Sequence, residues 1–115
     1  MKGFLVNNAS GDRCELAPVS LLGRSSECNV VITDPRASRR HAMIRRQDDG
    51  FWFFDLGSFN GSYLNGSRVT AARKLITGDV LDFEENRYLF EQEGDAFTPP
   101  AGAESSIGGS TIALI

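Results

Sequence analysis

The amino-acid sequence predicts an all-β fold, a β-sandwich, on three observations. Its 115 residues include eight Phe, one Trp and many Val and Ile, which are residues that favour strands. Turn-forming residues recur about every eight to twelve positions, the spacing of short strands joined by tight turns. No stretch repeats its apolar residues with the period of a helix. A chain of this length can bury a core without disulfides or metals, so we expect one domain.

About ten short strands follow in chain order, and each ends at a turn signal. They are expected at residues 3–6, 13–16, 19–24, 29–32, 41–46, 51–56, 68–69, 74–76, 80–83 and 87–91. Thr33-Asp34-Pro35 ends one of them, because the residue before a proline is pushed out of the helical region. Asp48-Asp49-Gly50 and Glu84-Glu85-Asn86 predict hairpin turns. The aromatic run at 51–56 predicts a strand that is buried on at least one face.

The composition changes at Gly94 to Pro, Gly, Ser and Ala, which is typical of a flexible linker. We therefore expect a domain at residues 1–93 and a linker or tail at 94–115 that leads to a further domain. Thr98 and Thr111 lie in this tail, and a phosphate on either would let the domain bind its own tail or that of a neighbour. A plain linker with incidental threonines is the simpler interpretation.

The net charge is only −3, which argues against a general binder of polyanions. Five arginines nevertheless lie between residues 36 and 46, with no acid among them. No leader and no apolar run long enough to span a bilayer is present, so a cytoplasmic location is expected. Cys14 and Cys28 match neither a zinc-ligand nor a CxxC spacing, and free thiols are expected unless the fold brings the two together.

Catalytic chemistry is poorly supplied. His41 is the sole histidine, so no cluster of histidines can hold a metal. It could serve a Ser or Cys nucleophile, but a lone histidine at a strand start is more often a hydrogen-bonded structural residue. No nucleophile-elbow, P-loop or dinucleotide motif is present. The sequence therefore predicts a protein that is not an enzyme and that has no cofactor or metal.

Anion recognition is better supplied, by arginines in predicted loops. Arg24 follows a glycine at a strand end, and Ser38 and Arg39 lie in the loop after a proline. A guanidinium offers a planar fork of donors that suits phosphate oxygens, and a serine hydroxyl with backbone amides can complete the shell. Arg45 and Arg46 are expected on a solvated sheet face instead.

Residues 57–66 contain two Asn-Gly pairs, at 60–61 and 65–66. Asn-Gly favours tight turns because both residues tolerate positive φ. Two pairs in close succession predict a compact loop in which backbone amides and short polar side chains converge, as in a binding loop. An ordinary polar hairpin tip is the alternative interpretation of the same residues.

Together these motifs resemble the forkhead-associated (FHA) domain. That family's pattern is Gly-Arg, then Ser-x-x-His, then Ser-x-Asn-Gly-Thr/Ser followed by Asn-Gly. The matching residues, in the family's order and usual spacing, are Gly23-Arg24, Ser38-Arg39-Arg40-His41, Ser58-Phe59-Asn60-Gly61-Ser62 and Asn65-Gly66. The resemblance covers roughly residues 3–92. It implies an FHA-like β-sandwich of about eleven strands, with loops at one end that bind phosphothreonine peptides.

The resemblance also implies roles for individual residues. Arg24 and Ser38 would contact the phosphate, and Arg39 would add a second cationic contact. Asn60 would hold the peptide backbone beside the phosphothreonine. Structural roles, including the positioning of the loops, would fall to Gly23, His41, Gly61 and Asn65.

Three further residues border the predicted binding site: Ser58, Arg36 and Phe59. Arg36 lies where some members of the family contact the ligand residue three positions after the phosphothreonine. The resemblance therefore implies a preference for an acidic side chain at that position of the ligand. Phe59 stands where some members place a threonine that touches the phosphate. This difference implies a lower affinity or an apolar contact with the ligand.

The sequence thus predicts a phosphothreonine-dependent interaction module from a larger signalling protein of bacterial type, and the resemblance implies selectivity for phosphothreonine over phosphoserine. A phosphate-independent interaction or oligomerisation domain on the same sandwich is the alternative. Phosphate dependence of binding separates the two. Nucleic-acid binding through the arginine run is disfavoured by the net charge and by the lack of aromatic residues for stacking in that run.

Overall fold

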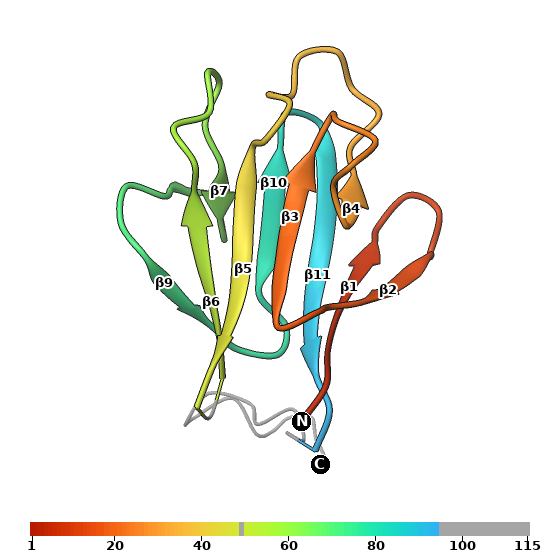
Figure 1. Cartoon of the computed structure of the whole chain (residues 1–115), viewed down its shortest axis with the longest axis vertical. Coiled ribbons are helices and arrows are strands. Elements are labelled where there is room, and N and C mark those ends of the chain that lie inside the picture. Colours follow the sequence, from red (N-terminus) through yellow and green to blue (C-terminus); the bar gives the residue numbers. More distant parts are fainter. Residues whose placement is uncertain (49, 95–115) are drawn as a thin grey trace.

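The computed structural model describes residues 1–48 and 50–94, and no helix occurs among them. They form eleven strands in two stacked sheets (Figure 1). In chain order the strands are β1 (Gly3–Asn7), β2 (Arg13–Glu15), β3 (Val19–Gly23), β4 (Val30–Val31), β5 (Ala42–Gln47), β6 (Gly50–Asp55), β7 (Tyr63–Leu64), β8 (Ser67–Arg68), β9 (Arg73–Leu75), β10 (Val80–Phe83) and β11 (Asn86–Gln92). The predicted all-β sandwich of about eleven strands is confirmed.

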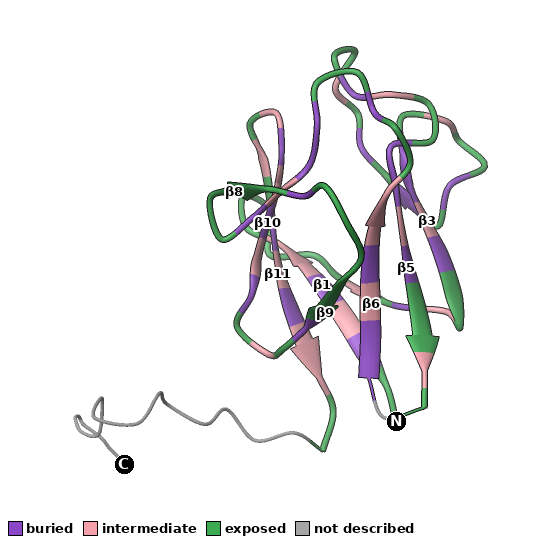
Figure 2. Ribbon diagram, turned by 90° about the vertical axis from the view of Figure 1, so that its left-hand side faces the viewer, coloured by how far each residue is buried: buried purple, intermediate pink, exposed green. Residues whose placement is uncertain are grey.

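The two sheets differ in the number and order of their strands. One has six strands in the order β2-β1-β11-β10-β7-β8, and the other has five in the order β4-β3-β5-β6-β9. Every recorded strand pair is antiparallel except β3 with β4, which run parallel. Seen edge-on, the sheets lie face to face with buried residues between them (Figure 2).

The core is built from alternate residues of the strands, because successive side chains of a strand point to opposite faces. On β6, Phe51 and Phe53 are buried while the residues between and after them are only partly covered. The Phe51 ring packs against Phe90 of the other sheet at 5.6 Å between centroids, and Phe53 packs against Phe83 at 6.0 Å. The expected burial of one face of this aromatic strand is confirmed.

Each predicted strand overlaps an observed one, and one observed strand was not predicted. The addition is β7, whose two residues are too few to show an alternating pattern. It pairs with β8 through the Asn65-Gly66 turn, where both residues have positive φ, 51° and 86°. Asn60-Gly61 makes no hairpin. It lies in the segment that crosses from β6 in one sheet to β7 in the other, and of these two residues only Gly61 has positive φ.

Four connections meet at one end of the sandwich, at the top of Figure 1: β3–β4, β4–β5, β6–β7 and β10–β11. We call this end the loop end.

The turn predicted at 48–50 joins β5 and β6, but Asp49 lies outside the described residues. The predicted linker at 94–115 also falls outside them, apart from Gly94. Among the described residues no helix is long and apolar enough to cross a membrane. Both cysteines are free thiols.

Candidate functional site

The β6–β7 loop takes its shape from the side chain of Asp55, the last residue of β6. One carboxylate oxygen accepts the backbone amides of Gly57 and Ser58, each at 3.0 Å. The other accepts the hydroxyls of Ser58 and Ser62, each at 2.6 Å. A single carboxylate therefore fixes both ends of the loop that carries Phe59 and Asn60.

Electrostatics at Asp55 favour the ionised form. Burial alone would raise the pKa of this carboxyl, but the hydrogen bonds from the Ser58 and Ser62 hydroxyls and from the Ser58 amide outweigh it. The pKa of Asp55 therefore lies below its ordinary value. The sequence prediction missed Asp55, although an Asp two residues before Gly-Ser is a signal for side-chain capping of a turn.

His41 joins two loops from within the core. Its side chain is fully buried, and its ring packs edge-on against Phe83 at 5.4 Å. The Ser38 amide donates to Nδ1 at 3.1 Å, so Nδ1 carries no proton and Nε2 must be the protonated nitrogen. Nε2 then donates to the Gly61 carbonyl at 2.8 Å. These two hydrogen bonds connect the His41 ring to the backbone of both loops.

Gly23 ends β3 directly against the β4–β5 loop. A Cβ at this position would overlap the carbonyl group of Arg39 and would lie 2.9 Å from the His41 amide nitrogen. Because no larger side chain fits, glycine allows the two segments to lie in contact. The Arg24 amide can then donate to the Ser38 carbonyl at 3.0 Å.

Arg24 and Ser38, the two residues expected at a phosphate, lie together. The Arg24 Nε donates to the Ala37 carbonyl at 3.1 Å, which leaves its two terminal amino groups without a partner among residues 1–48 and 50–94. The Ser38 hydroxyl oxygen accepts the Phe59 amide at 3.1 Å, so its proton remains available. A guanidinium and a hydroxyl that both offer free donors suit an oxyanion.

Arg39 follows Ser38 and faces an open pocket. The pocket has a volume of about 370 Å³ and is lined by Ser25, Glu27, Arg39 and Arg40. The Arg39 guanidinium makes no hydrogen bond or ion pair in the described part of the chain, while Arg40 lies 3.7 Å from Glu27. The Arg39 backbone carbonyl is held by the Ser25 amide at 3.1 Å and the Cys28 thiol at 3.3 Å.

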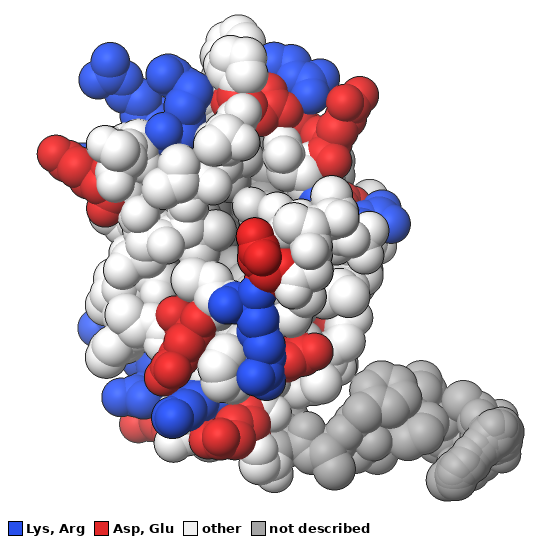
Figure 3. All heavy atoms as spheres, turned by 90° about the vertical axis from the view of Figure 1, so that its right-hand side faces the viewer, with Lys and Arg blue, Asp and Glu red and all other residues white. Residues whose placement is uncertain are grey.

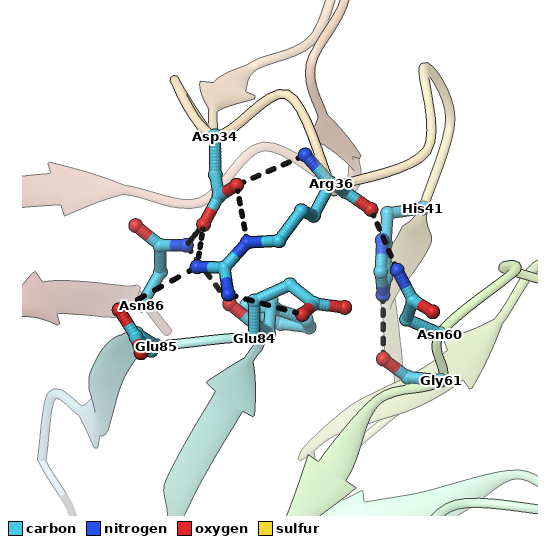
Figure 4. Close-up of polar contacts among 9 residues, drawn as sticks. Asp34, Arg36, His41, Asn60, Gly61, Glu84, Glu85 and Asn86 are labelled. Atoms are coloured by element: carbon cyan, nitrogen blue, oxygen red, sulfur yellow. Dashed lines mark hydrogen bonds and ion pairs between the residues drawn. The ribbon is translucent and has the colours of Figure 1, made fainter.

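Arg36 is engaged by acids on its own chain (Figure 4). Its guanidinium donates twice to Asp34, at 3.0 and 2.8 Å, and lies within 3.8 Å of Glu84 and 3.5 Å of Glu85. The hydrogen bonds from Arg36 hold the pKa of Asp34 well below its usual range and raise that of Arg36. The sequence prediction missed this cluster because Glu84 and Glu85 are distant in sequence.

The β6–β7 loop residues lie beside these groups with different exposures. Asn60 donates through Nδ2 to the Arg36 carbonyl at 3.1 Å, which links the loop to the β4–β5 connection. Phe59 is 88% exposed at the loop surface. Ser58 is buried, and its hydroxyl is used by Asp55. The structure therefore brings Arg24, Ser38, Arg39, Asn60, Arg36 and Phe59 to one end of the molecule.

Asn65 lies apart from that group and holds the β7–β8 turn. Its Nδ2 donates to Asp79 at 2.9 Å and its Oδ1 accepts the Val80 amide at 2.9 Å. The same Asp79 accepts the Ile76 amide at 2.8 Å. In the described residues no group of three or more His, Cys, Asp or Glu is arranged to hold a metal ion.

Comparison with known proteins places the chain beside a family of interaction domains. A family model for the FHA domain matches residues 21–84. The oxoglutarate dehydrogenase inhibitor of Corynebacterium diphtheriae is 37% identical over 73 residues, 64% of this chain and 50% of that protein. The FHA domain-containing protein FhaB of Mycolicibacterium smegmatis is 41% identical over 58 residues, 50% of this chain and 37% of that protein. This chain thus spans half or less of these relatives.

Solved structures show the same fold. Mycobacterium tuberculosis EmbR, in complex with a low affinity phosphopeptide, superposes with a TM-score of 0.76 and 27% identity over 78% of this chain and 24% of EmbR. A domain from a study of phosphothreonine-dependent FHA domain interactions superposes with a TM-score of 0.75 and 26% identity. That match covers 80% of this chain and 97% of the solved chain.

Proposed function

Because this chain belongs to the FHA domain family, we propose that it is a phosphothreonine-dependent protein-interaction module and not an enzyme. The observation that carries the proposal is the pairing of Arg24 with Ser38, whose free donors lie together on one loop end. Relatives named as an inhibitor and as a glycogen accumulation regulator support a regulatory role.

In this proposal Arg24 and Ser38 bind the phosphate through charge-assisted hydrogen bonds. Arg39, whose guanidinium has no partner in the described chain, adds a second cation from the next residue. Asn60 holds the ligand backbone with the part of its amide group that does not contact Arg36. Phe59 offers an exposed ring to an apolar side chain of the ligand. Ser58 acts indirectly, through its hydrogen bond to Asp55.

We also assign the module to the cytoplasm, because free thiols are typical of reducing compartments. Its ligand is a phosphothreonine segment of another protein, or of the tail that holds Thr98 and Thr111. A peptide of residues 94–115 phosphorylated at either threonine, titrated against the full chain, tests the tail. No binding at millimolar peptide removes the tail as a ligand and leaves other proteins as partners.

The experiment that tests the proposed function is a titration of the full chain with a degenerate phosphothreonine peptide library. Unphosphorylated and phosphoserine libraries serve as comparisons. We expect binding that requires phosphothreonine and is lost in Arg24→Ala. Arg45→Ala is the matched control, since Arg45 is exposed on β5 away from the loop end, and should bind normally. Binding that ignores phosphate in the folded protein would favour a phosphate-independent interaction domain instead.

A further inference from the structure

The loop end of the sandwich carries two charged groups of opposite net sign. The segment from Asp34 to Arg40 connects them, with Ser38 near its middle. Figure 3 shows basic side chains gathered at two separate places on this end of the molecule, with acidic side chains beside them. The proposed phosphate site therefore has a different electrostatic environment on each side.

The cationic side is the pocket lined by Ser25, Glu27, Arg39 and Arg40. It holds two guanidinium groups and one carboxylate. Glu27 lies 3.7 Å from Arg40, and both side chains are largely exposed, so that this pair is weak. Arg39 has no acidic partner among the described residues. The pocket therefore has a net positive charge and open space for an anionic group beside the phosphate that Arg39 is proposed to contact, since one guanidinium has donors for both.

The anionic side is the cluster around Arg36, drawn in Figure 4. One guanidinium faces three carboxylates there, those of Asp34, Glu84 and Glu85. Asp34 and Glu84 are nearly covered, at 11% and 15% exposure, while the Glu85 side chain is 86% exposed. Arg36 is thus neutralised by its own chain, and the surplus negative charge faces solvent at Glu85.

We propose that this loop end selects phosphothreonine peptides with an acidic group on one side of the phosphothreonine and a basic side chain on the other. The proposal rests on the proposed function, since the phosphothreonine must first occupy the site at Arg24 and Ser38. It also reverses the expectation for Arg36, whose engaged guanidinium makes its surroundings favour a cation of the ligand and not an acid.

The spacing along the chain sets where the two charges of the ligand fall. Arg36 and Arg39 are three residues apart, so their Cα atoms are separated by at most about 11 Å. An extended peptide advances about 3.3 Å per residue. Side chains within about three positions of the phosphothreonine can therefore reach both groups. Asn60 bonds the Arg36 carbonyl, which keeps the anionic side next to the residue expected to hold the peptide backbone.

The test uses two phosphothreonine peptides of identical composition and net charge. One carries Glu residues before and Lys residues after the phosphothreonine, within three positions, and the other carries them in the reverse order. We expect the full chain to prefer one order by about fivefold at low salt, the scale of a few exposed charge pairs. The preference should shrink as salt rises, because exposed charges are screened.

Variants assign the preference to the two groups. Glu85→Gln and Arg40→Gln should each reduce the ratio between the two peptides while phosphate dependence remains. Glu91→Gln is the matched control, because Glu91 lies on β11 and pairs with Arg13. Equal affinity for the two orders, or a preference unchanged in both variants, overturns the proposal. If neither peptide binds better than its unphosphorylated form, the proposed function fails instead.

Discussion

The imidazole Nε2 of His41 lies 2.8 Å from the carbonyl oxygen of Gly61 and donates to it. This hydrogen bond connects the end of the β4–β5 loop with the β6–β7 loop across the interior. The same ring accepts the Ser38 amide, so one side chain positions the serine proposed to bind phosphate and the segment that holds Asn60. The separation between the two halves of the site therefore depends on a residue that no ligand touches.

Replacement of His41 should destabilise the fold and weaken binding together. His41→Ala removes two hydrogen bonds and leaves a cavity beside Phe83, and we expect a loss of about 3 kcal/mol in the free energy of unfolding. His41→Gln keeps a terminal amide that can donate to Gly61 and should lose less. Urea unfolding followed by tryptophan fluorescence measures the loss of stability in both variants. Equal losses in the two variants would show that the link to Gly61 is unimportant.

Substitution at Asp55 should loosen the β6–β7 loop more than the sheets. In Asp55→Ala the amides of Gly57 and Ser58 and two hydroxyls lose their acceptor. We expect a loss of about 1–3 kcal/mol in stability and at least a tenfold weaker affinity for phosphothreonine peptide. Thermal unfolding and peptide titration measure the two effects. Unchanged affinity would mean that the loop keeps its shape without the carboxylate.

Stability should fall in acid partly through the same carboxyl. The folded-state pKa of Asp55 lies below its ordinary value of 3.8, so its ionised form contributes stability that is complete above that value. The contribution is lost as the pH falls through the lower folded-state pKa. Asp55→Asn lacks this titration, and we expect its stability to change less than that of the natural chain between pH 5 and 2. Parallel curves for the two proteins would contradict this assignment.

Two glycines should respond differently to an added methyl group. In Gly23→Ala the new Cβ overlaps backbone atoms of Arg39, which cannot move aside without shifting the loop. Gly11 has a φ of 79° and nothing within 4 Å of the added atom. Gly11→Ala should therefore lower the free energy of unfolding only through backbone strain, by about 1 kcal/mol. We expect Gly23→Ala to be clearly less stable than Gly11→Ala. Similar melting temperatures would show that the β4–β5 loop yields easily.

The fold could be predicted from the sequence because its signals are local. Strands such as β10, observed at Val80–Phe83, have clear turn residues on both sides, and the Asn65-Gly66 turn follows from backbone preference alone. The absence of a hairpin turn at Asn60-Gly61 has a physical reason. The chain after β6 is drawn to the opposite sheet, where β7 pairs with β10, and this long-range pairing decides the path of the loop.

The arrangement of the site was only partly predictable. The motif placed Arg24 and Ser38 in loops, but their contact depends on Gly23 packing against a segment that the chain reaches later. The partners of Arg36 could not be inferred, because Glu84 and Glu85 follow it by almost fifty positions and meet it through the β10–β11 turn. Local patterns identify which side chains are available, and tertiary packing decides which charges neutralise one another.

The pairing of the first and last strands determines how the domain would respond to mechanical load. Gly3 of β1 pairs with Gln92 of β11, and the Glu93 amide donates to the Lys2 carbonyl at 2.7 Å. Because these strands are antiparallel, a force that pulls the two ends apart acts across the ladder and breaks its hydrogen bonds one after another. The domain should therefore unzip at low force from the end where Gly3 and Gln92 pair. The loops at the other end would keep their contacts until β1 had peeled away.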